Sequence, residues 1–324
     1  MIRTSGRRFS GLAISALFAA SAHAAPANLP ALGDVGEFFR RAQGATEAPA
    51  VGAAEPLWEN AALQAIDNPW KRVTAPTRSA PEVIGNYSSG CLRGGAPLEA
   101  SGPNHHAMRL SRRRFYGHPR LVSYLRDLAQ RVGAEGLGTL FVGDLGQPRG
   151  GPTLSGHVSH QNGLDVDVWL RLGRAGENPT DAERETWETP DMVIAEFQGL
   201  NRDWDPRVVE LLRLSAQSPD VERVLINPVI KREVCRKYPG AAWLSKIRPY
   251  YFHADHFHAR LKCPPGNSRC RPQEPVPGGD GCGAELAEWF TPAREAEARR
   301  MRADTTPPRM PNLPDECARV LREP

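Results

Sequence analysis

The chain has 324 residues, 40% of them hydrophobic, which is enough for one large domain or two small ones around a buried core. Its formal charge of +4 comes from 41 basic and 37 acidic residues, but three of the arginines lie within the first eight residues. Without that N-terminal segment 38 basic residues stand against 37 acidic ones, and a charge near +1 argues against nucleic-acid binding, which needs a strongly basic surface.

The start of the chain has the features of a secretory signal peptide. Arg3, Arg7 and Arg8 give it a positive charge, and a short apolar stretch follows over residues 11–20. Ala22-His23-Ala24 then supplies small residues at the cleavage positions. We therefore predict a signal peptide over residues 1–24 and a periplasmic mature protein. No other stretch is apolar and long enough to span a bilayer, so no stable membrane insertion is expected.

Residues 25–67 are rich in Ala, Pro and Gly and show no sustained hydrophobic period, which predicts a flexible spacer. A short helix over residues 57–66 is the one element expected within it. The folded domain is predicted over residues 68–324. Its Pro-rich stretch at 303–314 is expected to form a strap, because Cys317 beyond it offers a covalent tie to the body.

Helical and extended patterns are interleaved through the predicted domain. Apolar residues at helical spacing predict helices over residues 119–132, 207–216 and 230–236. Extended patterns predict strands over residues 138–142, 164–172, 221–226 and 250–261. Because the helices are few, we predict an α+β fold, with a mainly antiparallel sheet, flanking helices and disulfide bridges.

The six cysteines favour disulfides over a structural metal site. None of them forms a Cys-x-x-Cys pair, and an even number in an exported chain is typical of three bridges. Cys263 and Cys270 flank the turn-rich segment Pro264-Pro265-Gly266-Asn267, so a local bridge between them is the simplest expectation. The spacing of the other four cysteines leaves their pairing open.

Five of the nine histidines lie in two short segments, residues 155–167 and 253–258. On a strand, His256 and His258 would point to the same face. His160 and Asp167 flank a bend that glycine permits. Imidazole and carboxylate donors with an open fourth position are typical of a catalytic zinc site. The spacing alone would let His256 serve either as a ligand or in proton transfer.

Other polar residues receive structural interpretations. His105, His106 and His118 lie outside the two segments and are expected to be structural. Arg112-Arg113-Arg114 is expected to be a solvated charge run. The serines beside the histidines lack the Gly-x-Ser-x-Gly and Ser-x-x-Lys contexts of serine nucleophiles, so no serine mechanism is predicted.

These segments carry a family resemblance. The spacing His160-x6-Asp167 followed by His256-x-His258 resembles the signature of lysostaphin-type, D-alanyl-D-alanine carboxypeptidase and Sonic hedgehog-type metallopeptidases. The similarity to the penicillin-insensitive murein endopeptidase family is fuller and runs from about Trp70 to Cys317, with the long N-terminal spacer as its departure. It is carried by the six-cysteine layout and by Phe115-Tyr116-Gly117-His118-Pro119, Ser155-Gly156-His157, Ser159-His160-Gln161, Gly163-Leu164-Asp165-Val166-Asp167, Asn227-Pro228 and residues 279–286.

The resemblance implies a role for each matching residue. His160, Asp167 and His258 would bind Zn2+. His256 would be the general base that takes a proton from the attacking water, and His253 would lie near the oxyanion or position that water. His157 matches a histidine near the metal that could bind a second ion. The resemblance also implies the bridges Cys91–Cys317, Cys235–Cys282 and Cys263–Cys270.

The resemblance further implies a zinc-dependent murein endopeptidase that hydrolyses D-alanyl–meso-diaminopimelyl cross-links in peptidoglycan. Two alternatives share the same metal site. One is a D,D-carboxypeptidase that releases terminal D-alanine, and the other is a non-catalytic zinc-containing module that binds the wall. A metal-dependent nuclease is disfavoured by the near-neutral charge, because phosphate contacts need a basic surface.

Overall fold

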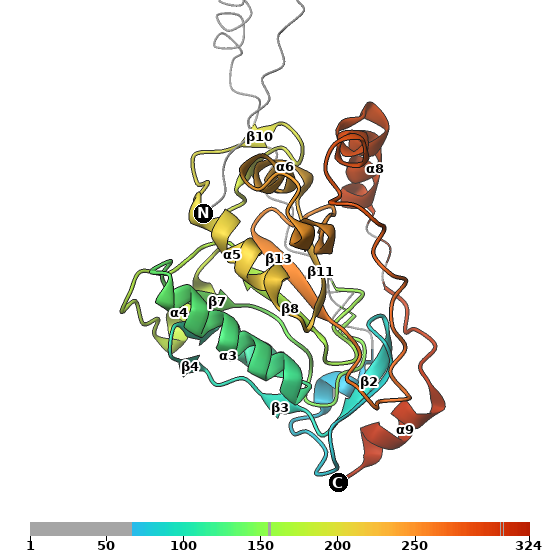
Figure 1. Ribbon diagram of the computed structural model, residues 1–324. Coiled ribbons are helices and arrows are strands. Elements are labelled where there is room, and N and C mark those ends of the chain that lie inside the picture. Colours follow the sequence, from blue (N-terminus) through green and yellow to red (C-terminus); the bar gives the residue numbers. More distant parts are fainter. Residues whose placement is uncertain (1–66, 155–156, 305, 307) are drawn as a thin grey trace, which may run out of the picture. The chain divides into compact units, whose positions relative to one another are not determined.

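The computed structural model describes residues 67–154, 157–304, 306 and 308–324 (Figure 1). All of them belong to the second of the two units into which the chain divides, Glu55–Pro324. The predicted signal peptide, and the predicted spacer apart from residue 67, lie outside the described residues. Within the described part, none of the helices combines the length and the apolar character that crossing a membrane requires.

A seven-stranded sheet forms the centre of the domain, with the strand order β12-β11-β13-β8-β7-β5-β4. Four of its six strand pairs are antiparallel, and the pairs β11–β12 and β5–β7 are parallel. The prediction of an α+β fold with a mainly antiparallel sheet is therefore confirmed. The strands, in sheet order, are β12 Ile247–Pro249, β11 Val221–Ile226, β13 His256–Leu261, β8 Asp165–Trp169, β7 Leu140–Val142, β5 His105–Ala107 and β4 Ser101–Gly102.

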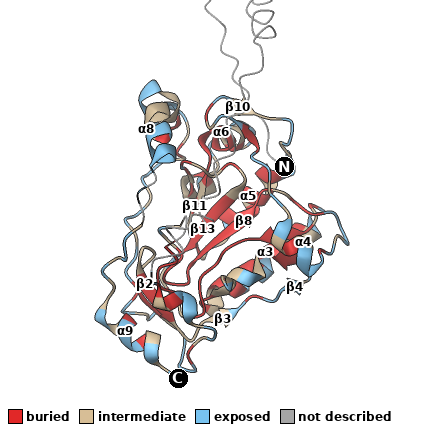
Figure 2. Cartoon of the chain, turned by 180° about the vertical axis from the view of Figure 1, so that it is seen from behind, coloured by how far each residue is buried: buried red, intermediate tan, exposed pale blue. Residues whose placement is uncertain are grey.

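Three helices carry the apolar faces that pack around this sheet: α3 Pro119–Ala134, α5 Arg207–Gln217 and α6 Pro228–Lys237. In Figure 1, α3 and α5 lie across one face of it. The α3 helix begins where it does because Pro119 suits the first turn, while the His118 side chain caps the helix by accepting a hydrogen bond from the Arg120 N–H. Figure 2 shows the central strands as buried, and all five residues of β8 are buried.

The remaining elements are shorter and lie around the sheet. The helices are α4 Asp181–Thr186, α7 Ala284–Ala287, α8 Pro292–Ala303 and α9 Asp315–Arg322, with 3-10 turns η2 Pro69–Arg72, η3 Leu110–Arg112, η4 Ala242–Lys246 and η5 Glu288–Phe290. The small two-stranded sheets are β1 Glu82–Asn86 with β2 Ser89–Arg93, β3 Ala96–Pro97 with β6 Tyr116–Gly117, and β9 Val193–Ile194 with β10 Gly199–Leu200.

The predicted strand over residues 250–261 is twice as long as the observed strand. Strand β13 begins only at His256, because the preceding residues form a turn in which Phe252 has a φ of 58°. A positive φ at a bulky residue is incompatible with extended pairing. This turn over residues 250–255 is named the histidine turn below, since it carries His253.

All three disulfides have the pairing that the family resemblance implies: Cys91–Cys317, Cys235–Cys282 and Cys263–Cys270. The first ties the C-terminal helix α9 to strand β2 and so fixes the predicted strap. Arg149 adds to this tie, because its Nη1 donates to the carbonyl oxygens of Val320 and Leu321, each at 3.0 Å.

Lys231 in α6 is fully buried. Its Nζ donates to two backbone carbonyl oxygens, that of Leu244 at 2.9 Å and that of Asp280 at 2.7 Å. Burial, reinforced by the nearby Arg248 guanidinium, lowers the pKa of Lys231 to about 7. The lysine thus anchors the turn that holds Cys282 while titrating near neutral pH.

This lysine should make the free energy of unfolding depend on pH. In the unfolded chain its pKa is about 10.4, so between about pH 7 and 10 the unfolded state binds more protons than the folded state. Stability should therefore rise with pH across this window, by at most about 1.4 kcal/mol per pH unit from this group. Urea unfolding of the wild type and Lys231→Met at several pH values measures it. As pH rises, the free energy of unfolding of the wild type should increase relative to that of Lys231→Met. A difference between the two proteins that does not change with pH would contradict the prediction.

Candidate metal centre

Two adjacent antiparallel strands bring the two histidine segments together. In the register between β8 and β13, His258 lies directly opposite Asp167. The loop before β8 turns back at Gly163, whose φ is 77°, and His160 itself has a φ of 69°. The His160 N–H donates to Asp165 Oδ2 at 3.2 Å, which holds this strained loop against the strand. The predicted bend at Gly163 is therefore present, and it places His160 beside Asp167.

Imidazole nitrogens from three positions converge on one oxygen of the Asp167 carboxylate. Asp167 Oδ1 lies 3.1 Å from His258 Nδ1, 3.3 Å from His160 Nε2 and 3.7 Å from His256 Nε2. The His160 and His258 rings are 4.7 Å apart between centroids. Burial alone would raise the pKa of Asp167, but His160, His256 and His157 hold it well below its ordinary value. The carboxylate is thus an anion at neutral pH, as a metal ligand must be.

His157 contacts the other oxygen of the same carboxylate. Its Nδ1 lies 3.6 Å from Asp167 Oδ2. The donor atoms of His157, His160 and Asp167 all lie within 4.8 Å of one another and form a candidate metal site. This set differs from the predicted ligand set by one member, with His157 in the place of His258. The assignment of individual ligands stays a prediction.

The chemistry of these donors fits a divalent metal. Both ring nitrogens of His160 are buried; among the described residues neither makes a hydrogen bond of good geometry, although Nε2 faces the Asp167 carboxylate at 3.3 Å. A buried imidazole left in this state is costly, and a metal would satisfy one of its nitrogens. Imidazole and carboxylate donors without thiolate are the set that zinc uses at catalytic sites.

A second carboxylate, Asp165, orients His258. Its Oδ1 lies 2.9 Å from His258 Nε2 and accepts from Arg260 Nε at 2.6 Å. Asp165 is fully buried; burial would raise its pKa, but Arg260 and His258 hold it below its ordinary value. Arg260 is itself fixed, with its guanidinium carbon 3.6 Å from the centre of the Tyr87 ring. With the Nε2–H of His258 donating to Asp165 Oδ1, Nδ1 is the nitrogen left to bind a metal beside Asp167.

Asp165→Asn should weaken metal binding by about 10–100-fold, the usual cost of losing a carboxylate that orients a ligand histidine. The measurement is competition for the metal against a chromophoric chelator. Asp203→Asn is the matched control, because Asp203 is exposed and its carboxylate makes none of these contacts. Equal affinities of the two variants would show that Asp165 does not orient His258.

His256 and His253 adjoin the cluster but have different hydrogen-bond partners. His256 Nδ1 donates to Asp255 Oδ1 at 2.6 Å. Burial would lower the pKa of His256, but Asp255 and Asp167 outweigh it and raise this pKa to about 9. A cation bound at Asp167 would offset that carboxylate, so it would bring the pKa of His256 back toward neutrality.

His253 is held as a neutral imidazole. Its Nδ1 donates to the Tyr251 carbonyl oxygen at 2.6 Å, which leaves Nε2 as a lone-pair acceptor. Burial, together with His256 and His258, lowers the pKa of His253 well below its ordinary value. The His253 ring lies 4.9 Å from the His256 ring and 6.2 Å from that of His258, between centroids. All six predicted site residues are therefore gathered in one cluster.

One carboxylate of the cluster, Asp144, was not predicted. Its Oδ2 lies 3.4 Å from His157 Nε2 and 2.9 Å from Arg114 Nη1. Arg112 also reaches it, so the prediction of a solvated charge run over residues 112–114 is wrong for Arg112 and Arg114, which are paired with this buried carboxylate. The one sequence signal at Asp144 is its place two residues after the buried strand β7.

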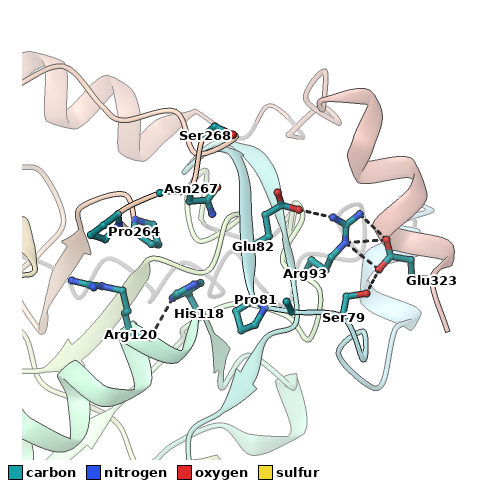
Figure 3. Close-up of a pocket in the computed structure, with 13 residues that line it drawn as sticks. Ser79, Pro81, Glu82, Arg93, His118, Arg120, Pro264, Asn267, Ser268 and Glu323 are labelled. Carbon is teal, nitrogen blue, oxygen red and sulfur yellow. Dashed lines mark hydrogen bonds and ion pairs between the residues drawn. The ribbon is translucent and has the colours of Figure 1, made fainter.

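The histidines predicted to be structural lie outside the cluster. His105 and His106 are buried in β5, and His118 caps α3. His118 also lines an open hollow of about 840 Å³, shown in Figure 3, which contains none of the six predicted site residues. In that hollow Arg93 is paired with both Glu82 and Glu323. The hollow is therefore large, but the charge of Arg93 in it is already neutralised by two carboxylates. The histidine cluster is the stronger candidate for a catalytic site.

The chain is similar to known proteins over most of its length. Residues 83–322 match the family described as penicillin-insensitive murein endopeptidase. A protein of that name from Klebsiella pneumoniae subsp. pneumoniae is 37% identical over 257 residues, covering 79% of this chain and 91% of that protein. One from Haemophilus influenzae is 38% identical over 262 residues, covering 79% and 88%. One from Escherichia coli is 37% identical over 257 residues, covering 79% and 91%.

Proposed function

The chain belongs to the penicillin-insensitive murein endopeptidase family, and from this membership we propose that it is a zinc-dependent endopeptidase acting on peptidoglycan cross-links between D-alanine and meso-diaminopimelate. The observation that carries the proposal is the convergence of His160, His258 and His256 on the Asp167 carboxylate. Zinc is proposed over harder cations because most of these donors are imidazoles.

The residues of the cluster divide into ligands and proton carriers. His160, Asp167 and His258 would hold the metal, and His157, whose Nδ1 faces Asp167 Oδ2, would be a further donor. Bound there, zinc would polarise the scissile carbonyl and make water a nucleophile near neutral pH. His256 takes the proton from the attacking water and returns it to the leaving amine, while Asp255 stabilises its charged form.

The tautomer of His253 decides between the two roles that the family resemblance implies for it. An imidazole whose Nδ1 donates to the Tyr251 carbonyl has no proton on Nε2. It can therefore accept a hydrogen bond from water, but it cannot donate one to an oxyanion in this state. Of the two roles implied by the family resemblance, we propose that His253 positions the attacking water.

Digestion of purified cross-linked muropeptide dimers tests the proposed function. The mature protein with zinc should convert dimers to monomers, followed by mass spectrometry, and a chelator should stop the reaction until zinc is restored. Release of D-alanine from intact dimers would instead identify a D,D-carboxypeptidase. Unchanged dimers that still bind the protein would identify a non-catalytic wall-binding module.

We also propose that the protein acts in the periplasm after removal of residues 1–24. Its three disulfides support an oxidising compartment, and its proposed substrate lies there. Cell fractionation followed by N-terminal sequencing tests this proposal. The periplasmic form should begin at Ala25, and an unprocessed cytoplasmic form would contradict it.

A further inference from the structure

The histidine turn is held in place by its backbone. The Tyr250 N–H donates to the Ile226 carbonyl at 2.8 Å, and the carbonyls of His253 and Ala254 accept from Asn227 N and Met192 N at 2.9 and 2.8 Å. These contacts all join backbone to backbone. They fix both ends of the turn to neighbouring elements and leave the central N–H, that of Phe252, to be satisfied in another way.

The acceptor for the Phe252 N–H is a side chain, the carboxylate of Glu196. Glu196 lies in the loop between β9 and β10, and its Oε1 accepts from Phe252 N at 2.9 Å and from Asn227 Nδ2 at 3.2 Å. The side chain is only 9% exposed, and its Oε2 faces Arg302 at 3.4 Å. A charged acceptor makes this a stronger contact than a neutral carbonyl would.

The contact coincides with backbone strain on both sides. Phe252 has a φ of 58°, and Ala195 and Glu196 have φ values of 41° and 61°. Non-glycine residues keep such a conformation only where the surroundings impose it. The neighbouring Phe197 packs against the Tyr251 ring, with centroids 6.1 Å apart. The loop between β9 and β10 therefore also contacts the histidine turn through apolar side chains.

The conformation of Phe252 controls the orientation of His253. The hydrogen bond that fixes the His253 ring runs from its Nδ1 back to the carbonyl oxygen of Tyr251, across Phe252. Its 2.6 Å length therefore depends on the φ and ψ of Phe252. If Phe252 relaxed to a negative φ, the Tyr251 oxygen would move away from the ring. The tautomer that leaves Nε2 as an acceptor would then no longer be enforced.

We propose that Glu196 is a positioning residue for His253: its carboxylate holds Phe252 in the left-handed conformation that sets the ring orientation and tautomer of His253. Only the effect of Glu196 on catalysis rests on the proposed function. The effect of Glu196 on the tautomer of His253 is independent of metal and substrate.

The first test uses the metal-free protein and nitrogen-15 NMR of its histidine side chains, with His253 assigned by comparison with His253→Gln. The wild type should show His253 as the Nδ1–H tautomer. Glu196→Ala should show a mixture of tautomers, and Glu196→Gln should retain the wild-type form, since its amide oxygen can still accept from Phe252 N. Glu196→Asp, which is one methylene too short, replaces the alanine variant if that variant does not fold.

Glu297→Ala is the matched control. Glu297 also contacts the histidine turn, but through the Tyr251 hydroxyl at 2.6 Å and not through the backbone of Phe252. Its variant should leave the His253 tautomer unchanged. An unchanged tautomer in Glu196→Ala, or an equal change in Glu297→Ala, would overturn the proposal.

The second test is kinetic and uses the zinc-loaded protein with muropeptide dimers. Glu196→Ala should lower kcat by up to about 100-fold, the scale of loss from a small misplacement near the reacting atoms, with KM little changed. Glu196→Gln should recover most of the loss, and a loss in KM alone would count against a positioning role. A wild type that cleaves no dimers would refute the proposed function, while the NMR result would still decide the role of Glu196.

Discussion

His258→Ala should bind zinc at least about 100-fold more weakly than the wild type and should cleave no detectable muropeptide dimer. Losing an outer residue that merely orients a ligand histidine already costs about 10–100-fold in affinity, so losing the ligand itself should cost more. The variant also removes the imidazole that lies between Asp165 and Asp167, so both buried carboxylates lose this contact. Metal content after dialysis, together with dimer digestion at saturating zinc, measures both effects.

His118→Asn is the control for this experiment. It removes a buried histidine outside the cluster, and asparagine is a favourable cap for the helix that His118 now caps. This variant should retain both metal and activity. Full activity of His258→Ala, or equal losses in the two variants, would exclude His258 from the metal centre.

His256→Ala should lower kcat by about 10²–10⁴-fold, the usual contribution of a general base, while the metal remains bound. The reason is geometric: His256 Nε2 is the most distant of the three imidazole nitrogens around Asp167 Oδ1, at 3.7 Å, and its other nitrogen is committed to Asp255. The ligands His160, Asp167 and His258 are untouched by the substitution. Metal content and kcat, measured on the same preparation, test both halves of the prediction.

The two histidine variants are most informative together. If His256→Ala lost its metal in parallel with its activity, His256 would be a ligand, as its spacing alone would permit. If it kept both, proton transfer would have to come from another group. Only loss of turnover with retained metal agrees with the division of roles proposed above.

Several elements of the fold could be predicted because each is specified by a strong pattern in its own segment of the sequence. Helix α3 has a clear apolar face and a proline in its first turn, and the prediction over residues 119–132 differs from the observed helix only at its C-terminal end. Helix α6 starts two residues before the predicted position, at Pro228, because the Asn227 side chain caps it there. Strand β11 matches its predicted bounds, residues 221–226.

The long-range arrangement could not be predicted from such signals. His258 and Asp167 are 91 residues apart, and the pairing of β13 with β8 that joins them is a tertiary event. The residue types and spacings were enough to name the members of the cluster. They were not enough to find Asp144 or Glu196, because each of these carboxylates acquires its role only from a partner distant in the chain.

The tie between Cys91 and Cys317 sets an order of events for biosynthesis. The two cysteines are separated by 226 positions, so strand β2, which is synthesised early, is joined covalently to helix α9, which is synthesised much later. The bridge joins β2 to α9, so it can form only after both segments have reached an oxidising compartment. A product truncated by ten residues would lack Cys317 and would keep a permanently unpaired thiol at Cys91. Formation of this bridge therefore requires a chain that extends at least through Cys317.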